Sequence, residues 1–227
     1  METITFSQAS LVAFATCRRR FQLRYLERLS WPDLPLTVQQ QTAIVQGQAF
    51  HQLIERFLLG LGQKTEAPVD DQLQLWWRRF RENMLPLPSG RVLPELQLTV
   101  PVGDHFLTGR FDLLIICGDG DKKELQVYDW KTSRPQTAKE LAETWQSKLY
   151  LALLAEGGGA LLEEKGMVLA DNVSLIYWYA SDPQLPRTIN YSQEQHAQNW
   201  SEIEALVREI DACLQAEEWP LTDNWSH

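Results

Sequence analysis

The chain has few cysteines, few basic residues and no long apolar run, and each shortage excludes a class of protein. Its three cysteines, Cys17, Cys117 and Cys213, are too few and too scattered for a disulfide framework. No run of about 18 apolar residues is present to span a bilayer, and no cleavable apolar segment opens the chain. We therefore expect a cytoplasmic protein with no membrane partner.

Basic residues are outnumbered by acidic ones, 21 against 30, so the formal net charge is −9 and the pI is near 5.0. This balance excludes a protein that coats nucleic acid by bulk attraction, and any such affinity must be local. Two clusters are candidates: Arg18, Arg19, Arg20, Arg24 and Arg28 in the first predicted helix, and Arg78, Arg79 and Arg81 beside Trp76 and Trp77. Such residues can contact phosphates and stack on bases, or they can form a solvated helix face and part of the core.

Length and composition favour a single domain. With 227 residues, 44% of them hydrophobic, the chain can bury a full core, and no repeat, long linker or low-complexity run divides it. We expect residues 1–85 to be mostly helical, residues 91–180 to form an α/β core and residues 193–218 to form a C-terminal helix. A loop over residues 30–36 should separate the two N-terminal helical segments, because it contains two prolines.

Two neighbouring segments in the middle of the chain have the alternation of β-strands. They are residues 105–116 and 125–132, and the GDGDKK sequence between them indicates a turn. If the turn is centred near residues 120 and 121, antiparallel pairing sets Leu114 against Val127. The sequence therefore predicts a β-hairpin.

The same register brings charged side chains together. Asp112 would stand opposite Asp129, on the face of Leu114 and Ile116, and Lys131 would share the face of Asp129. Two facing carboxylates repel each other, so a bound cation is expected between them, and Mg²⁺ prefers such oxygen ligands. An exposed strand end is the simpler alternative.

Two helical patterns flank the hairpin in sequence. Residues 137–156 carry an apolar stripe that is bordered by Gln146 and Tyr150, four positions apart. Upstream, residues 50–58 carry another stripe with His51 at its edge. A lone histidine at such a place is usually a half-buried helix residue, so its meaning depends on the other motifs.

The order of these motifs resembles the PD-(D/E)XK nuclease superfamily, specifically the RecB-like branch that includes AddB and CRISPR-associated nucleases. The motifs are GQAFH ending at His51, GRFD ending at Asp112, YDWK with Asp129 and Lys131, and QSKLY with Gln146 and Tyr150. The resemblance runs from about Ser7 to the C-terminus. It implies a restriction-endonuclease-like αβββαβ core with a mixed central sheet and added N-terminal and C-terminal helices. Glu95 is a weaker match to an acidic position before GRFD and is equally well a solvated strand residue.

The resemblance implies a metal-dependent deoxyribonuclease that acts on single-stranded DNA or duplex ends in DNA repair, recombination or defence. The implied catalytic residues are Asp112, Asp129, Lys131, Gln146 and Tyr150. The implied ligands of Mg²⁺ or Mn²⁺ are His51, Asp112, Asp129 and the Trp130 carbonyl. Lys131 would position or activate the attacking water, and Gln146 and Tyr150 would contact DNA or orient Lys131. The alternative is a nucleic-acid-binding module that docks to a helicase or repair partner, with weak or absent catalysis.

Cys17 has a further interpretation that depends on the same resemblance. Some RecB-like nucleases use such a cysteine, with three more near the C-terminus, to hold an iron–sulfur cluster through four thiolates. No two cysteines of this chain have C-x-x-C spacing, although the tail EEWPLTDNWSH looks like the lead-in to such a triplet. We expect a [4Fe-4S] cluster only if the natural chain continues past His227 with further cysteines. Otherwise Cys17 is an ordinary buried thiol.

Overall fold

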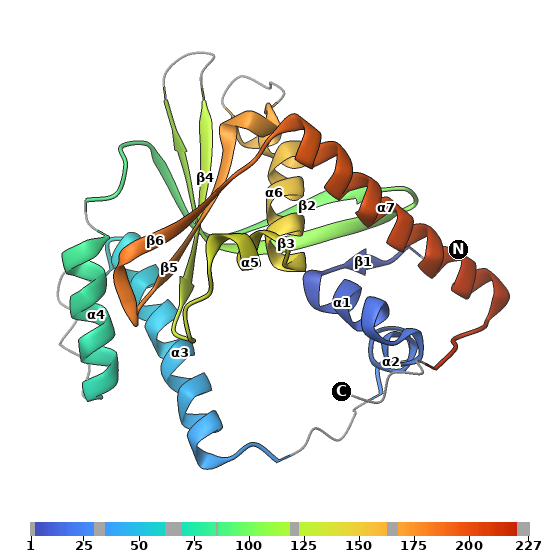
Figure 1. Ribbon diagram of the computed structural model, residues 1–227, viewed down its shortest axis with the longest axis horizontal. Coiled ribbons are helices and arrows are strands. Elements are labelled where there is room, and N and C mark those ends of the chain that lie inside the picture. Colours follow the sequence, from blue (N-terminus) through green and yellow to red (C-terminus); the bar gives the residue numbers. More distant parts are fainter. Residues whose placement is uncertain are drawn as a thin grey trace.

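The computed structural model describes residues 3–29, 35–61, 70–84, 86–118, 123–162 and 168–221, and shows an α/β fold with helices on both faces of a mixed sheet (Figure 1). This confirms the predicted fold class. In the described part of the chain the sheet has six strands in the order β1-β3-β4-β5-β6, with β2 paired to β3. The strands are β1 (Thr5–Phe6), β2 (Arg91–Val102), β3 (His105–Cys117), β4 (Glu124–Lys131), β5 (Val173–Tyr179) and β6 (Asp182–Asn190).

Helices precede, interrupt and follow the strands. The α-helices are α1 (Gln8–Thr16), α2 (Arg18–Phe21), α3 (Val38–Leu58), α4 (Asp71–Asn83), α5 (Ala138–Ala142), α6 (Trp145–Gly157) and α7 (Gln193–Ala216). A π-helical turn, η1 (Gln22–Leu26), follows α2, and two 3-10 turns, η2 (Gly158–Leu161) and η3 (Ala170–Asn172), lie between α6 and β5. Within the described residues, no helix combines the length and apolar character needed to cross a membrane.

Each face of the sheet has its own hydrophobic core. On one face, α1, α2, α6 and α7 cover a large cluster that includes Leu114 and Val127. On the other face, α3 and α4 pack Phe50, Ile54 and Phe80 against the aromatic and aliphatic side chains of β3, β4 and β5. The helices α6 and α3 lie on opposite faces of the sheet (Figure 1).

The predicted hairpin register is confirmed where the strands pair. β3 and β4 are antiparallel, and Leu114 lies opposite Val127, as expected. The ladder ends at the pair Leu113–Tyr128, and the next position on each strand holds Asp112 and Asp129. The turn predicted around residues 120 and 121 lies outside the described residues, as do residues 30–34 of the predicted loop and residues 222–227 of the tail.

Three local predictions differ from the structure. The helix expected over residues 137–156 is two helices, because the Thr144 side chain caps the N-terminus of α6 by accepting the Ser147 N–H. The first arginine cluster is not on the first helix, since α1 ends at Thr16; four of its arginines follow in α2 and η1, and Arg28 lies after η1. The strand β6 was not predicted, because two prolines interrupt its pattern, and an edge strand tolerates them.

Candidate active site

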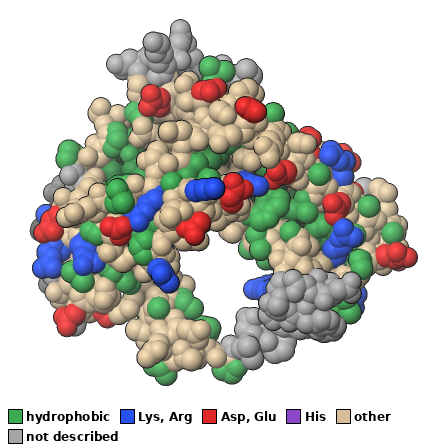
Figure 2. All heavy atoms as spheres, viewed as in Figure 1, with side chains coloured by type: hydrophobic (Ala, Val, Ile, Leu, Met, Phe, Trp, Pro, Cys, Tyr) green, Lys and Arg blue, Asp and Glu red, His purple; other side chains and the backbone are tan. Residues whose placement is uncertain are grey.

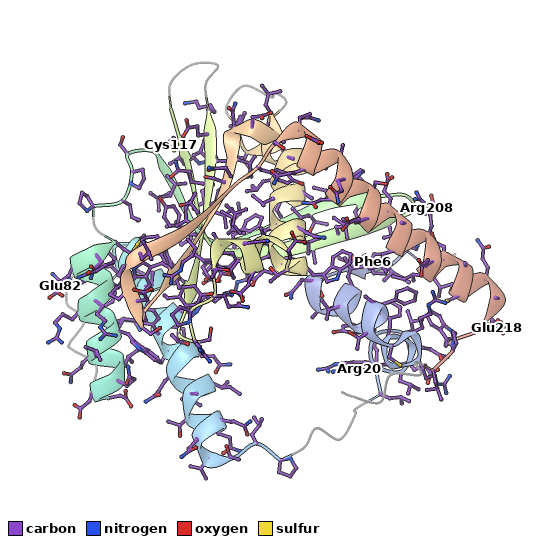
Figure 3. The ribbon with its side chains drawn as sticks, in the orientation of Figure 1. Phe6, Arg20, Glu82, Cys117, Arg208 and Glu218 are labelled. Carbon is purple, nitrogen blue, oxygen red and sulfur yellow. The ribbon has the colours of Figure 1, made fainter. Side chains whose placement is uncertain are left out.

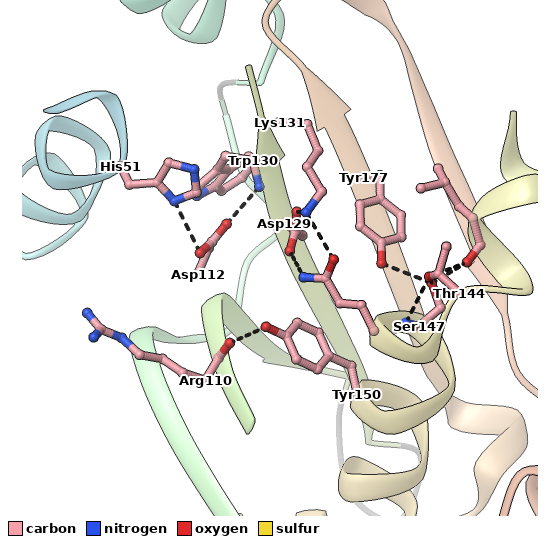
Figure 4. Close-up of polar contacts among 12 residues, drawn as sticks. His51, Arg110, Asp112, Asp129, Trp130, Lys131, Thr144, Ser147, Tyr150 and Tyr177 are labelled. Atoms are coloured by element: carbon pink, nitrogen blue, oxygen red, sulfur yellow. Dashed lines mark hydrogen bonds and ion pairs between the residues drawn. The ribbon is translucent and has the colours of Figure 1, made fainter. Parts of the chain in front are cut away.

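The end of β4 holds a closed group of three side chains. Asp129 is buried, and its Oδ1 accepts a hydrogen bond from Gln146 Nε2 at 2.6 Å. Lys131 Nζ donates to Gln146 Oε1 at 3.0 Å and lies 2.7 Å from Asp129 Oδ2 (Figure 4). Among the described residues, this ion pair with Lys131 is the contact of the buried Asp129 Oδ2, which accepts no other hydrogen bond. Asp129 and Lys131, predicted from one motif, therefore meet Gln146, predicted from another.

Two further features hold this group in place. Lys131 Nζ lies 5.3 Å from the centre of the Tyr177 ring, and β5 places Tyr177 directly beside Asp129 in the parallel ladder. The Ser147 hydroxyl donates to the Leu141 carbonyl, so the Tyr177 hydroxyl, 2.9 Å away, donates to Ser147 Oγ. The sequence analysis did not single out Tyr177, and only its place in the aromatic run of β5 marks it.

Asp112 faces the opposite helix layer. Its Oδ2 accepts the Trp130 N–H at 2.8 Å, and its Oδ1 lies 3.2 Å from His51 Nδ1 on α3. In Figure 4, Asp112 and His51 lie on one side of β4, and Asp129 with α6 lies on the other. Asp112 was expected to share the face of Leu114 and Ile116. Its side chain instead contacts His51 on α3, the helix that covers the other face of the sheet.

A distortion in the β2–β3 hairpin accounts for this difference. The pairs Pro94–Leu113 and Leu96–Phe111 place Glu95 opposite Asp112, but Glu95 has a φ of 52°. Such a φ is uncommon outside glycine and interrupts the regular alternation of side chains. On β3 itself, Phe111 and Leu113, two positions apart, pack into different cores, so the alternation changes at Asp112 and its side chain leaves the core that Leu114 and Ile116 fill.

Glu95 completes a group that can hold a metal ion. Among the described residues, ligand atoms of His51, Glu95 and Asp112 all lie within 4.8 Å of one another. They line an open cleft of about 610 Å³ together with Gly47, Gln48, Gln52, Glu55 and Arg110. Glu95 was a weak candidate from the sequence. The turn at Gly103–Asp104 pairs Val102 with His105. Continuing this antiparallel pairing back along β2 and forward along β3 would have placed Glu95 beside Asp112.

The charges of the site are not balanced by its own cations. Burial and the nearby Asp112 carboxylate raise the pKa of Asp129 to about 6, against the lowering effect of Lys131. Burial and Asp112 also raise the pKa of Glu95, although Arg110 opposes them. Burial lowers the pKa of His51, but its hydrogen bond to Asp112 and the surrounding carboxylates outweigh burial and raise it. The site therefore favours added positive charge.

These residues fit a hard divalent cation. Carboxylate oxygens are the ligands that Mg²⁺ and Mn²⁺ prefer, and imidazole is compatible with Mn²⁺. The buried Asp129 Oδ2 pairs with the Lys131 ammonium and accepts no other hydrogen bond among the described residues, so it keeps a lone pair for a ligand role. Trp130 lies beside Asp112 through its backbone N–H, which keeps the Trp130 peptide next to the carboxylates.

Tyr150 has a defined partner in the structure. It lies one turn after Gln146 on α6, and its hydroxyl donates to the Arg110 carbonyl at 2.6 Å. Burial raises the pKa of the Tyr150 hydroxyl, which keeps it a hydrogen-bond donor. α6 approaches β3 closely at Gly109, because a Cβ there would lie 2.6 Å from Leu153 Cδ1 and would force that side chain to shift. Tyr150 therefore reaches β3 and Arg110, while Gln146 reaches the end of β4.

The four predicted DNA-binding arginines differ in their surroundings. Arg18 forms an ion pair with Glu209 at 2.7 Å, and Arg19 donates to Gln22 Oε1. Arg20 and Arg24 are exposed. In Figure 3, Arg20 points into the space between α2 and α3, and Figure 2 shows basic side chains around the opening there.

The tryptophans of the second cluster belong to the core. Trp76 is buried against Phe50, and Trp77 stacks on Phe80 with their ring centres 5.7 Å apart. Arg79 donates to the Ala180 carbonyl at 2.8 Å. The rings that could stack on unpaired bases are therefore already packed, which favours a structural role for this cluster.

Comparison with known proteins identifies the family. The family model for the PD-(D/E)XK nuclease superfamily matches residues 5–226. The chain belongs to this superfamily. A candidate exonuclease from Eubacterium rectale has a similar fold, with a TM-score of 0.59 and 13% sequence identity over 97% of this chain and 85% of that protein. The crystal structure of SSO0001 is more distant, with a TM-score of 0.43 and 17% identity over 92% of this chain and 78% of that one. No curated protein matches the chain.

Membership implies a phosphodiester hydrolase that acts on nucleic acid, in a superfamily that typically uses a divalent metal. The similar structure from Eubacterium rectale shares the fold, and its low identity transfers no residue roles. The roles of individual residues in this chain are therefore argued from their geometry.

Proposed function

We propose that the protein is a metal-dependent deoxyribonuclease. The observation that carries the proposal is the junction of two groups at the end of β4. His51, Glu95 and Asp112 form a metal-sized cluster that lines the cleft, and Asp129 and Lys131 lie on the neighbouring strand. Carboxylates can hold a divalent cation, and an ammonium can stabilise the charge on the reacting phosphate, so together they suit phosphodiester hydrolysis.

Each side chain then has a part in hydrolysis. Asp112, Asp129, His51 and the Trp130 carbonyl would hold Mg²⁺ or Mn²⁺, with Glu95 as an added ligand. A bound divalent cation lowers the pKa of water and offsets negative charge on the phosphate. Lys131 orients or activates the attacking water and stabilises the charge that develops on the phosphate oxygens. Gln146 fixes the Lys131 ammonium by accepting its hydrogen bond.

The direct test uses purified protein with labelled single-stranded, duplex and circular DNA, each with Mg²⁺, Mn²⁺ or EDTA. We expect cleavage with either metal and none with EDTA. Cleavage of linear DNA without cleavage of circular DNA would assign an exonuclease, the activity for which the protein from Eubacterium rectale is named. Binding of DNA without cleavage under all conditions would instead favour the nucleic-acid-binding module.

Metal binding can be measured separately by titrating Mn²⁺ into the protein without DNA. Glu95→Gln should weaken Mn²⁺ binding by about tenfold or more, because it removes a charged oxygen from the open cluster. Glu204→Gln, on the exposed face of α7, is the matched control. Equal Mn²⁺ affinity in the wild type and Glu95→Gln would exclude Glu95 as a ligand.

The iron–sulfur cluster is a separate proposal about the natural protein. Trp219 stacks on Phe21, with ring centres 5.9 Å apart, so the C-terminal segment lies against the corner of α1 and α2 that contains Cys17. If the natural chain carries further cysteines after His227, the protein purified without oxygen would be brown and contain iron, and Cys17→Ser would remove both properties. Colourless, iron-free natural protein would exclude the cluster.

A further inference from the structure

Arg110 is the basic side chain of the candidate active-site cleft. It lies on β3, two residues before Asp112, and it lines the cleft with His51 and Glu95. The other described residues that line the cleft are neutral or acidic apart from His51. The Arg110 side chain is 65% exposed, although its neighbour Glu95 is 16% exposed. A substrate that enters the cleft would therefore meet this guanidinium.

The Arg110 guanidinium is paired with one acceptor and keeps hydrogen-bond donors for another. Its Nε donates to Glu95 Oε2 at 2.5 Å, and among the described residues this is the guanidinium's one hydrogen bond. Arginine has five N–H donors in a planar fork, so both Nη groups remain for another acceptor. In Figure 4 the guanidinium lies on the side of the site that holds His51 and Asp112.

The backbone of Arg110 is fixed from the helix layer. The Tyr150 hydroxyl donates to the Arg110 carbonyl at 2.6 Å, and β2 pairs Gln97 with Arg110 on the other side. The same helix, α6, supplies Gln146 to Asp129 and Lys131. One helix therefore sets the position of Arg110 relative to the reacting groups.

We infer that Arg110 binds a phosphate of the DNA beside the one that is cleaved, and that Tyr150 and Glu95 are positioning residues for it. The inference rests on the proposed function, because it needs a nucleic-acid substrate in the cleft. A guanidinium matches phosphate oxygens through two parallel hydrogen bonds, which a neutral or acidic cleft cannot otherwise supply. The phosphate is either an internal phosphodiester or a terminal phosphate of the strand.

DNA binding in Ca²⁺ without cleavage tests this role, with the wild-type cleavage assay done first. Arg110→Gln should weaken binding about 10-fold to 100-fold and reduce the slope of log affinity against log salt by about 0.7 to 0.9. Mn²⁺ binding without DNA should stay within about twofold, which separates phosphate contact from damage to the metal site. Arg208→Gln, at an exposed arginine of α7 (Figure 3), is the matched control and should bind DNA like the wild type.

Two further experiments identify which phosphate Arg110 binds and how Tyr150 contributes to that binding. If Arg110 binds a terminal phosphate, its loss will affect 5′-phosphorylated or 3′-phosphorylated strands and spare circular DNA; an internal contact affects all substrates. Tyr150→Phe should weaken binding about threefold to tenfold in the wild type and have no further effect in Arg110→Gln, because it acts through Arg110.

The outcomes separate the inference from the proposed function. Wild-type protein that cleaves no DNA overturns the proposed nuclease. Wild-type protein that cleaves DNA, with Arg110→Gln unchanged in affinity and salt slope, overturns the role of Arg110 alone. A loss of Mn²⁺ binding that matches the loss of DNA binding also overturns it, because Arg110 would then act through the metal site.

Discussion

The two sides of the candidate active site differ in how completely their charges are paired. On the α6 side, Asp129, Lys131 and Gln146 contact one another, and only 5% of the Asp129 side chain is exposed. On the α3 side, His51 and Asp112 line an open cleft, and 32% of the His51 side chain is exposed. One half is closed by protein contacts, and the other is open to solvent.

This difference separates two tasks that a nuclease must perform. A cation and a substrate phosphate have to enter from solvent, which suits the open group on α3. The ammonium of Lys131 has to keep one position during the reaction, which suits the closed group on α6. Because β4 links the two groups through Asp129 and Trp130, a change on one side should be measurable on the other.

The largest effect on the rate of DNA cleavage is expected from substitution of Asp112 or Asp129. Asp112→Asn and Asp129→Asn should each lower the rate of DNA cleavage by about 10³-fold or more, because each removes a charged ligand. Circular dichroism should show a folded protein in both cases, since asparagine keeps an acceptor oxygen for the same donors. Metal-dependent cleavage by Asp129→Asn at the wild-type rate would show that the two groups do not act together.

The next effect should come from Lys131 on the closed side. Lys131→Gln should reduce turnover about 10² to 10⁴-fold, with little change in DNA affinity, because the ammonium acts on the reacting groups rather than on binding. Single-turnover kinetics and filter binding measure the two quantities. An equal loss in both would make Lys131 a phosphate contact and remove the distinction between the sides.

Stability in the absence of metal should depend on pH through Asp129. Its pKa is raised by burial to about 6, whereas an unfolded aspartate titrates near 3.9, so the folded protein binds the extra proton between these values. The free energy of unfolding should therefore fall by up to about 3 kcal/mol as the pH rises from about 4 to 6. Urea unfolding of the wild type and Asp129→Asn, compared pH by pH, isolates this slope.

His51 should affect the free energy of unfolding over a higher pH range than Asp129 does. Its pKa is raised above the usual value, so its contribution to stability is present below about pH 6.5 and is lost as the pH rises through the folded pKa. The difference between the wild type and His51→Gln should show this second loss. A single common range for both residues would mean that the two sides titrate as one group.

The smallest effect, a change in DNA affinity, should come from the arginines distant from the cleft. Arg20→Gln and Arg24→Gln, at exposed positions, should each weaken DNA binding a few-fold and reduce the salt slope by about 0.7 to 0.9. Arg18→Gln should have less effect, because Arg18 already pairs with Glu209. Equal salt slopes in all three variants and the wild type would place these arginines on a solvated face.

Local patterns in the sequence predicted the paired strands and the helix that carry the residues of this site. The pairing of Leu114 with Val127 followed from strand alternation on both sides of one turn, which involves residues close in sequence. The helical position of Gln146 and Tyr150 followed from spacing alone. The edge strand β6 was missed, because its prolines break the pattern and its pairing with β5 supplies the order that the local sequence lacks.

The sequence by itself determined which chemical groups are present, their order along the chain and the α/β class of the fold, because these depend on residue identity and short-range periodicity. Only the tertiary structure decided how the groups are divided. The interrupted alternation of β3, opposite Glu95, leaves Asp112 beside His51 on α3, and the packing of α6 leaves Gln146 beside Asp129. These directions depend on contacts between segments far apart in sequence, which no local pattern records.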